Sequence, residues 1–156
     1  MVREALRAGL ENFLKEKGIR FRILKFREKT TTVKEAEKAL GISRDKIVKT
    51  LVFIDDSGSP VAAIVTGDKK VDEKKLAMVC NAKKVKIASP REVEMITGFE
   101  VGGLPPVGHG LRTIIDKRVM RNEVVYGGGG DSNSLLEIAT ADLKKLADAI
   151  IEDIAK

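Results

Sequence analysis

Apolar residues follow two different spacings along this chain, and the two spacings alternate from one end to the other. A helical spacing of apolar residues predicts helices over 2–17, 33–40, 73–80, 90–97 and 140–154. Alternating or continuously apolar segments predict strands over 19–23, 46–55, 61–66, 83–88, 112–116, 124–126 and 135–138. This mixture predicts a single α+β domain over residues 1–156, with a mixed central sheet flanked by helices.

The two most apolar strands, 46–55 and 61–66, are separated by a short segment of Asp, Ser, Gly and Pro. These residue types favour a turn, so the two strands are expected to pair as a hairpin. The second strand is apolar at nearly every position, which indicates burial on both faces. The hairpin is therefore expected at the centre of the sheet.

Local signals mark several helix boundaries. Two helix starts carry a capping box, in which Glu follows a Ser or Thr by three positions: Thr32 with Glu35, and Ser89 with Glu92. Thr140 is expected to cap a terminal helix whose apolar side includes Ile150 and Ile154. The first helix is expected to present one apolar face, made of Leu6, Leu10, Phe13 and Leu14.

Composition excludes several classes of protein. The chain has 156 residues, 43% of them hydrophobic and 33% charged, as in soluble globular proteins. No apolar run is long enough to cross a bilayer and the start lacks a signal peptide, so a cytoplasmic protein without membrane contact is expected. With Cys80 as its one cysteine and His109 as its one histidine, the chain has no internal disulfide, and neither a metal nor a cofactor is expected.

The net charge of +6 favours a polyanionic partner such as a nucleic acid. A basic protein without such a partner would have the same composition. Charge alone leaves both alternatives open.

The segment Val101–Gly110 reads Val-Gly-Gly-Leu-Pro-Pro-Val-Gly-His-Gly. Pro105 and Pro106 exclude a continuous helix or a central strand and stiffen the loop. Gly102 and Gly103 are expected to expose backbone N–H groups that could hold an oxygen atom of a ligand. The alternative is a tight connection between a helix and a strand without a functional role.

Lys49 lies between apolar neighbours in the middle of the strand predicted over 46–55. A buried ammonium needs a carboxylate or an anionic ligand, because desolvation of an unpaired charge is strongly unfavourable. The alternative is a strand with one solvated edge, from which Lys49 points outward. The sequence alone slightly favours this alternative.

Other candidates have a structural explanation that is at least as good as the functional one. Gly127–Gly130 lacks the continuation of a Walker loop and is interpreted as a mobile hairpin connection. Gly67 and Asp68 form a turn that could contact a ligand. Cys80 is interpreted as a core thiol. His109 could act as a general base, but no Ser or Cys is placed to complete a triad with it.

An ordered series of motifs resembles the YbaK/ProX-type aminoacyl-tRNA deacylases, which are related to the editing domain of bacterial prolyl-tRNA synthetases. The resemblance extends from about Thr30 to the C-terminus. Its motifs are Lys49-Thr-Leu-Val, Ala63-Ile-Val-Thr-Gly-Asp, the segment 71–77, Glu92-Val with Thr97-Gly, the loop 101–108, Ile115-Asp116, and a late Gly run followed by Leu136-Glu-Ile.

This resemblance implies a mixed α+β fold whose central sheet is partly closed. It also implies hydrolysis of the ester in mischarged aminoacyl-tRNA, with Lys49 and the Gly102–Pro106 loop around the aminoacyl-adenosine end. Catalytic roles would fall to Lys49, Gly102 and Gly103. Substrate contacts would fall to the neighbouring residues Thr50, Gly67, Asp68, Pro105, Pro106, Gly108 and His109, although His109 matches a variable position.

The resemblance further implies tRNA for proline that carries a small wrong amino acid, such as Cys or Ala, with prolyl-tRNA synthetase as a possible partner. Thr50 stands where alanine-clearing members often carry Asn, so the chain resembles the cysteine-clearing branch more closely. Two alternatives remain from the residues themselves. One is a non-catalytic module that binds tRNA or a synthetase, and the other is a hydrolase of a small nucleotide or phosphate ester.

Overall fold

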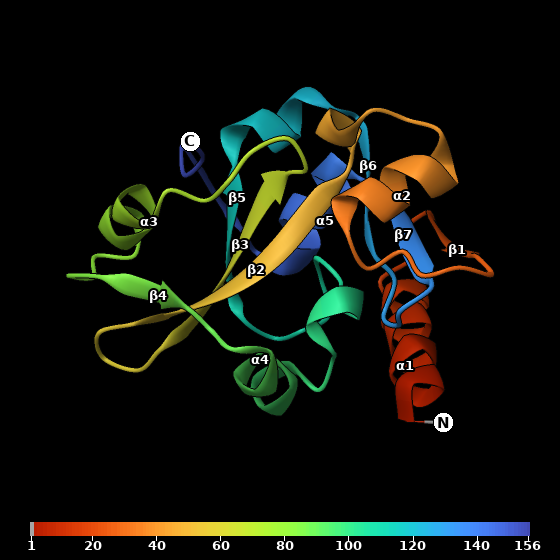
Figure 1. Ribbon diagram of the computed structural model, residues 1–156, viewed down its shortest axis with the longest axis horizontal. Coiled ribbons are helices and arrows are strands. Elements are labelled where there is room, and N and C mark those ends of the chain that lie inside the picture. The colour runs from red at the N-terminus through yellow and green to blue at the C-terminus, as the bar shows by residue number, and fades with distance from the viewer. Residues whose placement is uncertain (1) are drawn as a thin grey trace.

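The computed structural model describes the backbone of residues 2–156 and the side chains from residue 9 onward. Figure 1 shows a long central hairpin, with α2 near one end and the other helices around it. The helices are α1 (Val2–Glu16), α2 (Val33–Leu40), α3 (Glu73–Val79), α4 (Pro90–Thr97) and α5 (Thr140–Ala147), with 3-10 turns η1 (Arg44–Lys46), η2 (Val101–Gly103) and η3 (Lys117–Arg121). The strands are β1 (Phe21–Lys25), β2 (Val48–Asp55), β3 (Pro60–Thr66), β4 (Val85–Ile87), β5 (Arg112–Asp116), β6 (Val124–Gly128), β7 (Ser134–Ala139) and β8 (Ile150–Glu152).

The strands form two sheets. The larger sheet has the order β4-β2-β3-β5-β8, in which β2 pairs antiparallel with β3 and β4, while β3, β5 and β8 run parallel. The smaller sheet, β1-β7-β6, is antiparallel. An isolated bridge between Ile47 and Tyr126 links the two. The predicted α+β fold with a mixed sheet and flanking helices is confirmed, but the sheet is not closed.

The central hairpin is confirmed, and β3 is buried on both faces as its composition predicted. On one face, Ile64 packs in a cluster with Leu10 of α1 and Leu143 of α5. On the other face, Val65 packs in a cluster with Leu76 of α3. The two helical layers therefore cover opposite faces of the same strand. Of the predicted apolar face of α1, Leu10 and Leu14 are buried, whereas the side chain of Leu6 lies outside the described residues.

Both predicted capping boxes are formed. The Thr32 side chain accepts from the backbone N–H of Glu35, and Ser89 accepts from that of Glu92, while each Glu side chain bonds back to its cap residue. These contacts are local, so the sequence alone determines them.

The C-terminal prediction is wrong in two respects. The last helix ends at Ala147, and Asp148 follows in the left-handed conformation with a φ of 48°. Ile150 then begins β8, which extends the edge of β5. The open edge of β5 accepts a β-branched segment that would otherwise continue a helix. Thr140 does not act as a side-chain cap either, because its hydroxyl donates to the Asn122 carbonyl at 2.7 Å.

Two smaller predictions are also corrected. The first strand lies two residues later than expected, because its register with β7 pairs Phe21 with Ile138. The run Gly127–Gly130 is not a mobile connection throughout, since Gly127 and Gly128 belong to β6. A Cβ on Gly128 would collide with the Leu104 carbonyl oxygen, so this glycine permits the loop after α4 to lie directly against β6.

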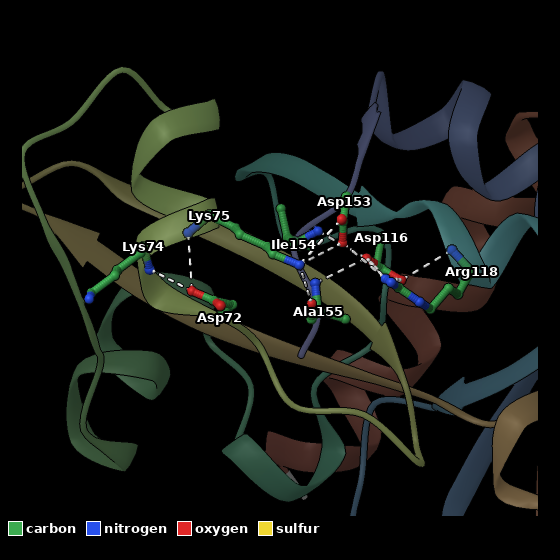
Figure 2. A network of polar contacts seen from close by, with 8 residues as sticks. All are labelled: Asp72, Lys74, Lys75, Asp116, Arg118, Asp153, Ile154 and Ala155. Carbon is green, nitrogen blue, oxygen red and sulfur yellow. Dashed lines mark hydrogen bonds and ion pairs between the residues drawn. The ribbon is translucent and has the colours of Figure 1, made fainter.

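A buried carboxylate fixes the C-terminal segment to the sheet (Figure 2). Asp116 is fully buried at the end of β5 and accepts the backbone N–H groups of Ile154 at 2.9 Å and Ala155 at 3.1 Å. It also pairs with Arg118 at 3.1 Å, and Arg118 contacts Asp153 at 3.0 Å. The Ile115-Asp116 motif thus has a structural role, which holds β8 and the residues after it in place.

Candidate active site

A cavity of about 270 Å³ lies between the two sheets, at the open edge of β2. This edge is open because β4 pairs with β2 only from Phe53 onward. Side chains from both faces of β2 therefore reach the cavity. Its lining is mostly aliphatic, with Lys49 and a few hydroxyl groups: Thr30, Thr31, Thr32, Val33, Ala36, Ile47, Val48, Lys49, Thr50, Leu51, Val101, Gly102, Leu104, Gly127, Gly128 and Leu135.

Lys49 is half-buried and lines this cavity. No carboxylate in the described part of the chain forms an ion pair with it. Burial lowers the pKa of the Lys49 ammonium, and the positive charge of Lys70 lowers it further. Asp68 raises this pKa and Arg44 lowers it, both to a smaller extent. Lys49 is thus a half-buried cation in the wall of an apolar cavity, with no carboxylate paired to it in the described part of the chain.

The start of the Gly-Pro loop forms the other wall. Val101, Gly102 and Leu104 line the cavity. A Cβ on Gly102 would lie 2.8 Å from two side-chain carbons of Thr31, so only glycine fits between the loop and the segment before α2. The sequence predicted that the N–H groups of both Gly102 and Gly103 are free for a ligand. The Gly103 N–H is not free, because it donates to the Glu100 carbonyl at 3.0 Å.

Thr50 is buried and also lines the cavity, next to Lys49. Gly67 and Asp68 do not line it. The Gly67 N–H donates to the carbonyls of Arg44 and Ile47, and this turn packs against η1. Asp68 acts on the site through its charge, since it raises the pKa of Lys49.

The second half of the Gly-Pro loop turns away from this cavity. Pro105 and Pro106 are buried, and Pro106 packs near Gly127 of β6. Gly108 and His109 line a separate cavity of about 350 Å³, between the end of α1 and α5. The structure thus brings Lys49, Thr50 and Gly102 together and places Gly108 and His109 elsewhere.

His109 holds the loop in shape. Its side chain is 8% exposed, its Nε2 lies 3.2 Å from the Pro106 carbonyl oxygen, and its Nδ1 accepts the Leu111 N–H at 3.1 Å. Burial lowers the pKa of His109, and the contact with Pro106 raises it by less. A neutral imidazole that donates through Nε2 satisfies both contacts.

Sequence reasoning missed the residues that complete the cavity from α2 and β7. Thr31 and Ala36 lie just before and within α2, whereas Leu135 lies in β7, far along the sequence from both. The three consecutive threonines before α2 were a visible signal, but only the cap at Thr32 was identified from them. The apolar wall could not be assigned without knowledge of how the two sheets meet.

The cavity lining contains few groups that could take part in a reaction. Lys49 is its one titratable side chain, and the lining contains no carboxylate, imidazole or thiol. Among the described residues, no three His, Cys, Asp or Glu side chains gather as a metal site. No helix in the part of the chain that the structure describes has the length and apolarity to span a membrane.

Comparisons with known proteins identify the family of this chain. A family model described as "Aminoacyl-tRNA editing domain" matches residues 27–146. The chain is similar to a proline–tRNA ligase of Nitratidesulfovibrio vulgaris (strain DP4), with 42% identity over 100 residues, 64% of this chain and 16% of the ligase. It therefore spans about a sixth of the length of that relative.

Two further relatives match over most of both chains. A protein of Enterococcus faecalis named "Putative Cys-tRNA(Pro)/Cys-tRNA(Cys) deacylase EbsC" is 28% identical over 119 residues, 75% of this chain and 73% of that protein. A solved structure described as "Crystal structure of a putative trans-editing enzyme for prolyl tRNA synthetase" superposes with a TM-score of 0.87 and 29% identity, over 96% of both chains. Because the family model covers most of its length, this chain belongs to the aminoacyl-tRNA editing domain family.

Proposed function

We propose that this protein hydrolyses the ester that joins a wrong amino acid to the 3′-terminal adenosine of tRNA. The observation that carries the proposal is Lys49, a cation without an ion-pair partner among the described residues, in the wall of a small apolar cavity. An apolar wall suits a small amino-acid side chain, and an ammonium suits the oxygen atoms of the ester and ribose.

The reaction requires no nucleophile from the protein. The oxygen of a water molecule bonds to the ester carbonyl carbon, and the bond from that carbon to the ribose oxygen breaks. The proton lost by the water ends on the ribose oxygen, which gives free amino acid and intact tRNA. Negative charge develops on the carbonyl oxygen during the attack, and the Lys49 ammonium stabilises it there.

Gly102 supplies the second group at the reacting ester. Its N–H forms no backbone hydrogen bond within the described residues, in contrast to the N–H of Gly103. The protein also accelerates the reaction by positioning the ester and the water. This is sufficient because an aminoacyl ester is already labile, so a moderate lowering of the barrier is enough. Thr50, which is buried beside Lys49, would contact the substrate within the cavity.

The proposed substrate is tRNA for proline that carries a small wrong amino acid. Cysteine is the preferred amino acid, and alanine is the second choice. Two relatives support this choice, since the Enterococcus faecalis protein is named for Cys-tRNA(Pro) and the solved structure for prolyl tRNA synthetase. Cavity size supports it as well, since about 270 Å³ leaves little room for a large side chain beside the ribose. Prolyl-tRNA synthetase is the corresponding partner, and the cytoplasm is the expected location.

A panel of mischarged tRNAs tests this function. We expect release of free cysteine from tRNA for proline, slower release of alanine, and retention of proline. Lys49→Ala serves as the inactive control, and Lys84→Gln, an exposed residue before β4, serves as the control for loss of one charge. Binding of the charged tRNA without release of amino acid would instead favour the non-catalytic module. Turnover of mononucleotides without tRNA would favour the phosphate-ester hydrolase.

A further inference from the structure

A groove of about 590 Å³ adjoins the cavity. The two share Thr31, Val101 and Gly102, so the contact between Thr31 and Gly102 forms the ridge that separates them. The other side of the groove is formed by Lys29, before α2, and by the first turns of α4. A ligand that extends out of the cavity over this ridge enters the groove directly.

The size of the cavity makes such an extension necessary. Its volume of about 270 Å³ lies below the roughly 300–1,000 Å³ of pockets that enclose whole drug-sized ligands. An amino acid with its ribose accounts for that space. The adenine of the terminal adenosine and the nucleotide before it then lie on the surface that borders the cavity.

Two cations of this groove are available for a phosphate. Lys29 and Arg91 are both exposed, and neither forms an ion pair with a carboxylate in the described part of the chain. Lysine and arginine bind phosphate through charge-assisted hydrogen bonds, and arginine can do so through two parallel N–H groups. The groove also contains two carboxylates, Glu94 and Glu100, so it is not simply a basic surface.

The carboxylates give the groove a preference among bases. Glu94 lies one turn after Arg91 on α4, so the two side chains lie on the same face of the helix. A glutamate accepts a hydrogen bond from the exocyclic amino group of cytosine, whereas uracil presents a carbonyl oxygen at that position. Pro90 and the exposed Val101 add apolar surface for the face of a base.

We infer that this groove binds the cytidine nucleotide that precedes the terminal adenosine of tRNA. Lys29 and Arg91 bind its phosphate, and Glu94 accepts a hydrogen bond from the amino group of its base. The inference rests on the proposed function for the identity of the strand, since the 3′ end of tRNA reads cytidine, cytidine, adenosine.

The first test measures binding of the uncharged trinucleotide CCA, which requires no hydrolysis. We expect Arg91→Gln and Lys29→Gln each to weaken binding about tenfold. Each variant should also lower the slope of log affinity against log salt concentration by roughly one, because it loses one phosphate contact. Lys84→Gln, which removes an equal charge away from the groove, should leave affinity nearly unchanged. Equal affinities for the groove variants and this control would overturn the inference.

The second test addresses the base. Replacement of the middle cytidine by uridine should weaken binding about tenfold in the native protein and have little effect in Glu94→Ala. A preference for cytidine over uridine that persists unchanged in Glu94→Ala contradicts the assigned contact.

Hydrolysis separates this inference from the proposed function. With cysteinyl-adenosine, which lacks the preceding nucleotide, the groove variants should match the native rate, whereas with cysteinyl-tRNA they should be slower. If no charged substrate releases amino acid but CCA binding still depends on Lys29 and Arg91, then the proposed function fails and the groove assignment stands.

Discussion

The side chain of Thr31 occupies the space into which any side chain at Gly102 would project, because a Cβ on Gly102 would lie 2.8 Å from both Cβ and Cγ2 of Thr31. Thr31 cannot easily withdraw. Its hydroxyl donates to Glu35 at 2.9 Å and its backbone N–H donates to the same carboxylate at 3.1 Å. The capping box of α2 therefore fixes one wall of the cavity against the other.

Gly102→Val should abolish deacylation with a modest loss of stability. The new side chain displaces Thr31 or the loop, and either shift misplaces the groups that hold the ester. Single-turnover release of amino acid, measured beside the thermal midpoint, checks this expectation. Gly9→Ala is the matched control, because a Cβ on Gly9 meets nothing within 4 Å. Unchanged turnover by Gly102→Val would remove the loop from the site.

His109→Ala should retain most activity but lose about 1–3 kcal/mol of stability, since the half-buried Leu111 N–H and the buried Pro106 carbonyl lose their partner. The pH dependence has a definite sign. Burial holds the pKa of His109 below the ordinary 6.5, so the unfolded chain takes up a proton first as the pH falls. The native protein therefore loses stability as the pH falls below about 6.5. His109→Ala should not show this loss, because it lacks the imidazole.

Urea unfolding of both proteins at a series of pH values measures this difference. A thousandfold loss of deacylation in His109→Ala would contradict the expectation and identify a general base.

Asp116→Asn should cost about 3–5 kcal/mol of stability, because it leaves Arg118 and two buried backbone N–H groups poorly paired. Asp153→Asn is the matched control at the same Arg118. The Asp153 side chain is 39% exposed and solvent screens its ion pairs, so its loss should cost far less stability than the loss of Asp116. Chemical denaturation gives both values. Similar small losses for the two variants would mean that Asp116 does not anchor the C-terminal segment.

The elements that sequence predicted well depend on neighbours along the chain. The boxes at Thr32 and Ser89 involve residues three positions apart, and the hairpin of β2 and β3 needs only a short turn. Long-range pairing explains the failures. Ile150 pairs with Ile114, and that partner decides that the residue joins a strand rather than a helix.

The candidate site divides in the same way. Lys49 and Gly102 were identified because a charge within an apolar strand and a glycine before prolines are unusual locally. Thr31 was missed, since its role depends on the approach of two distant segments. His109 was grouped with the loop by sequence proximity, although the chain turns between Pro106 and Gly108 and carries it to another cavity.

The Lys49 ammonium should destabilise the folded protein at neutral pH. Because its pKa is lowered on folding, the unfolded chain binds more protons between the folded value and the ordinary 10.5. Stability therefore rises with pH across that window, and Lys49→Met should remove the rise and stabilise the protein at neutral pH. Lys70→Gln should raise the pKa of Lys49, and Asp68→Asn should lower it. Titration of the Lys49 side chain by NMR measures both shifts, and shifts of the opposite sign would show that these charges do not act on it.

Lys49 should be the most sensitive side chain for activity. Lys49→Ala should lower the single-turnover rate about a hundredfold or more, the scale for loss of one preorganised group that stabilises developing charge. The thermal midpoint should hold or rise, because the ammonium has no ion-pair partner among the described residues. Lys49→Arg should restore little, since a planar guanidinium does not replace a compact ammonium in a cavity of about 270 Å³. If Lys49→Ala instead unfolds the protein, the lysine is structural. If rate and midpoint both stay unchanged, the cavity at β2 is not the site of ester hydrolysis.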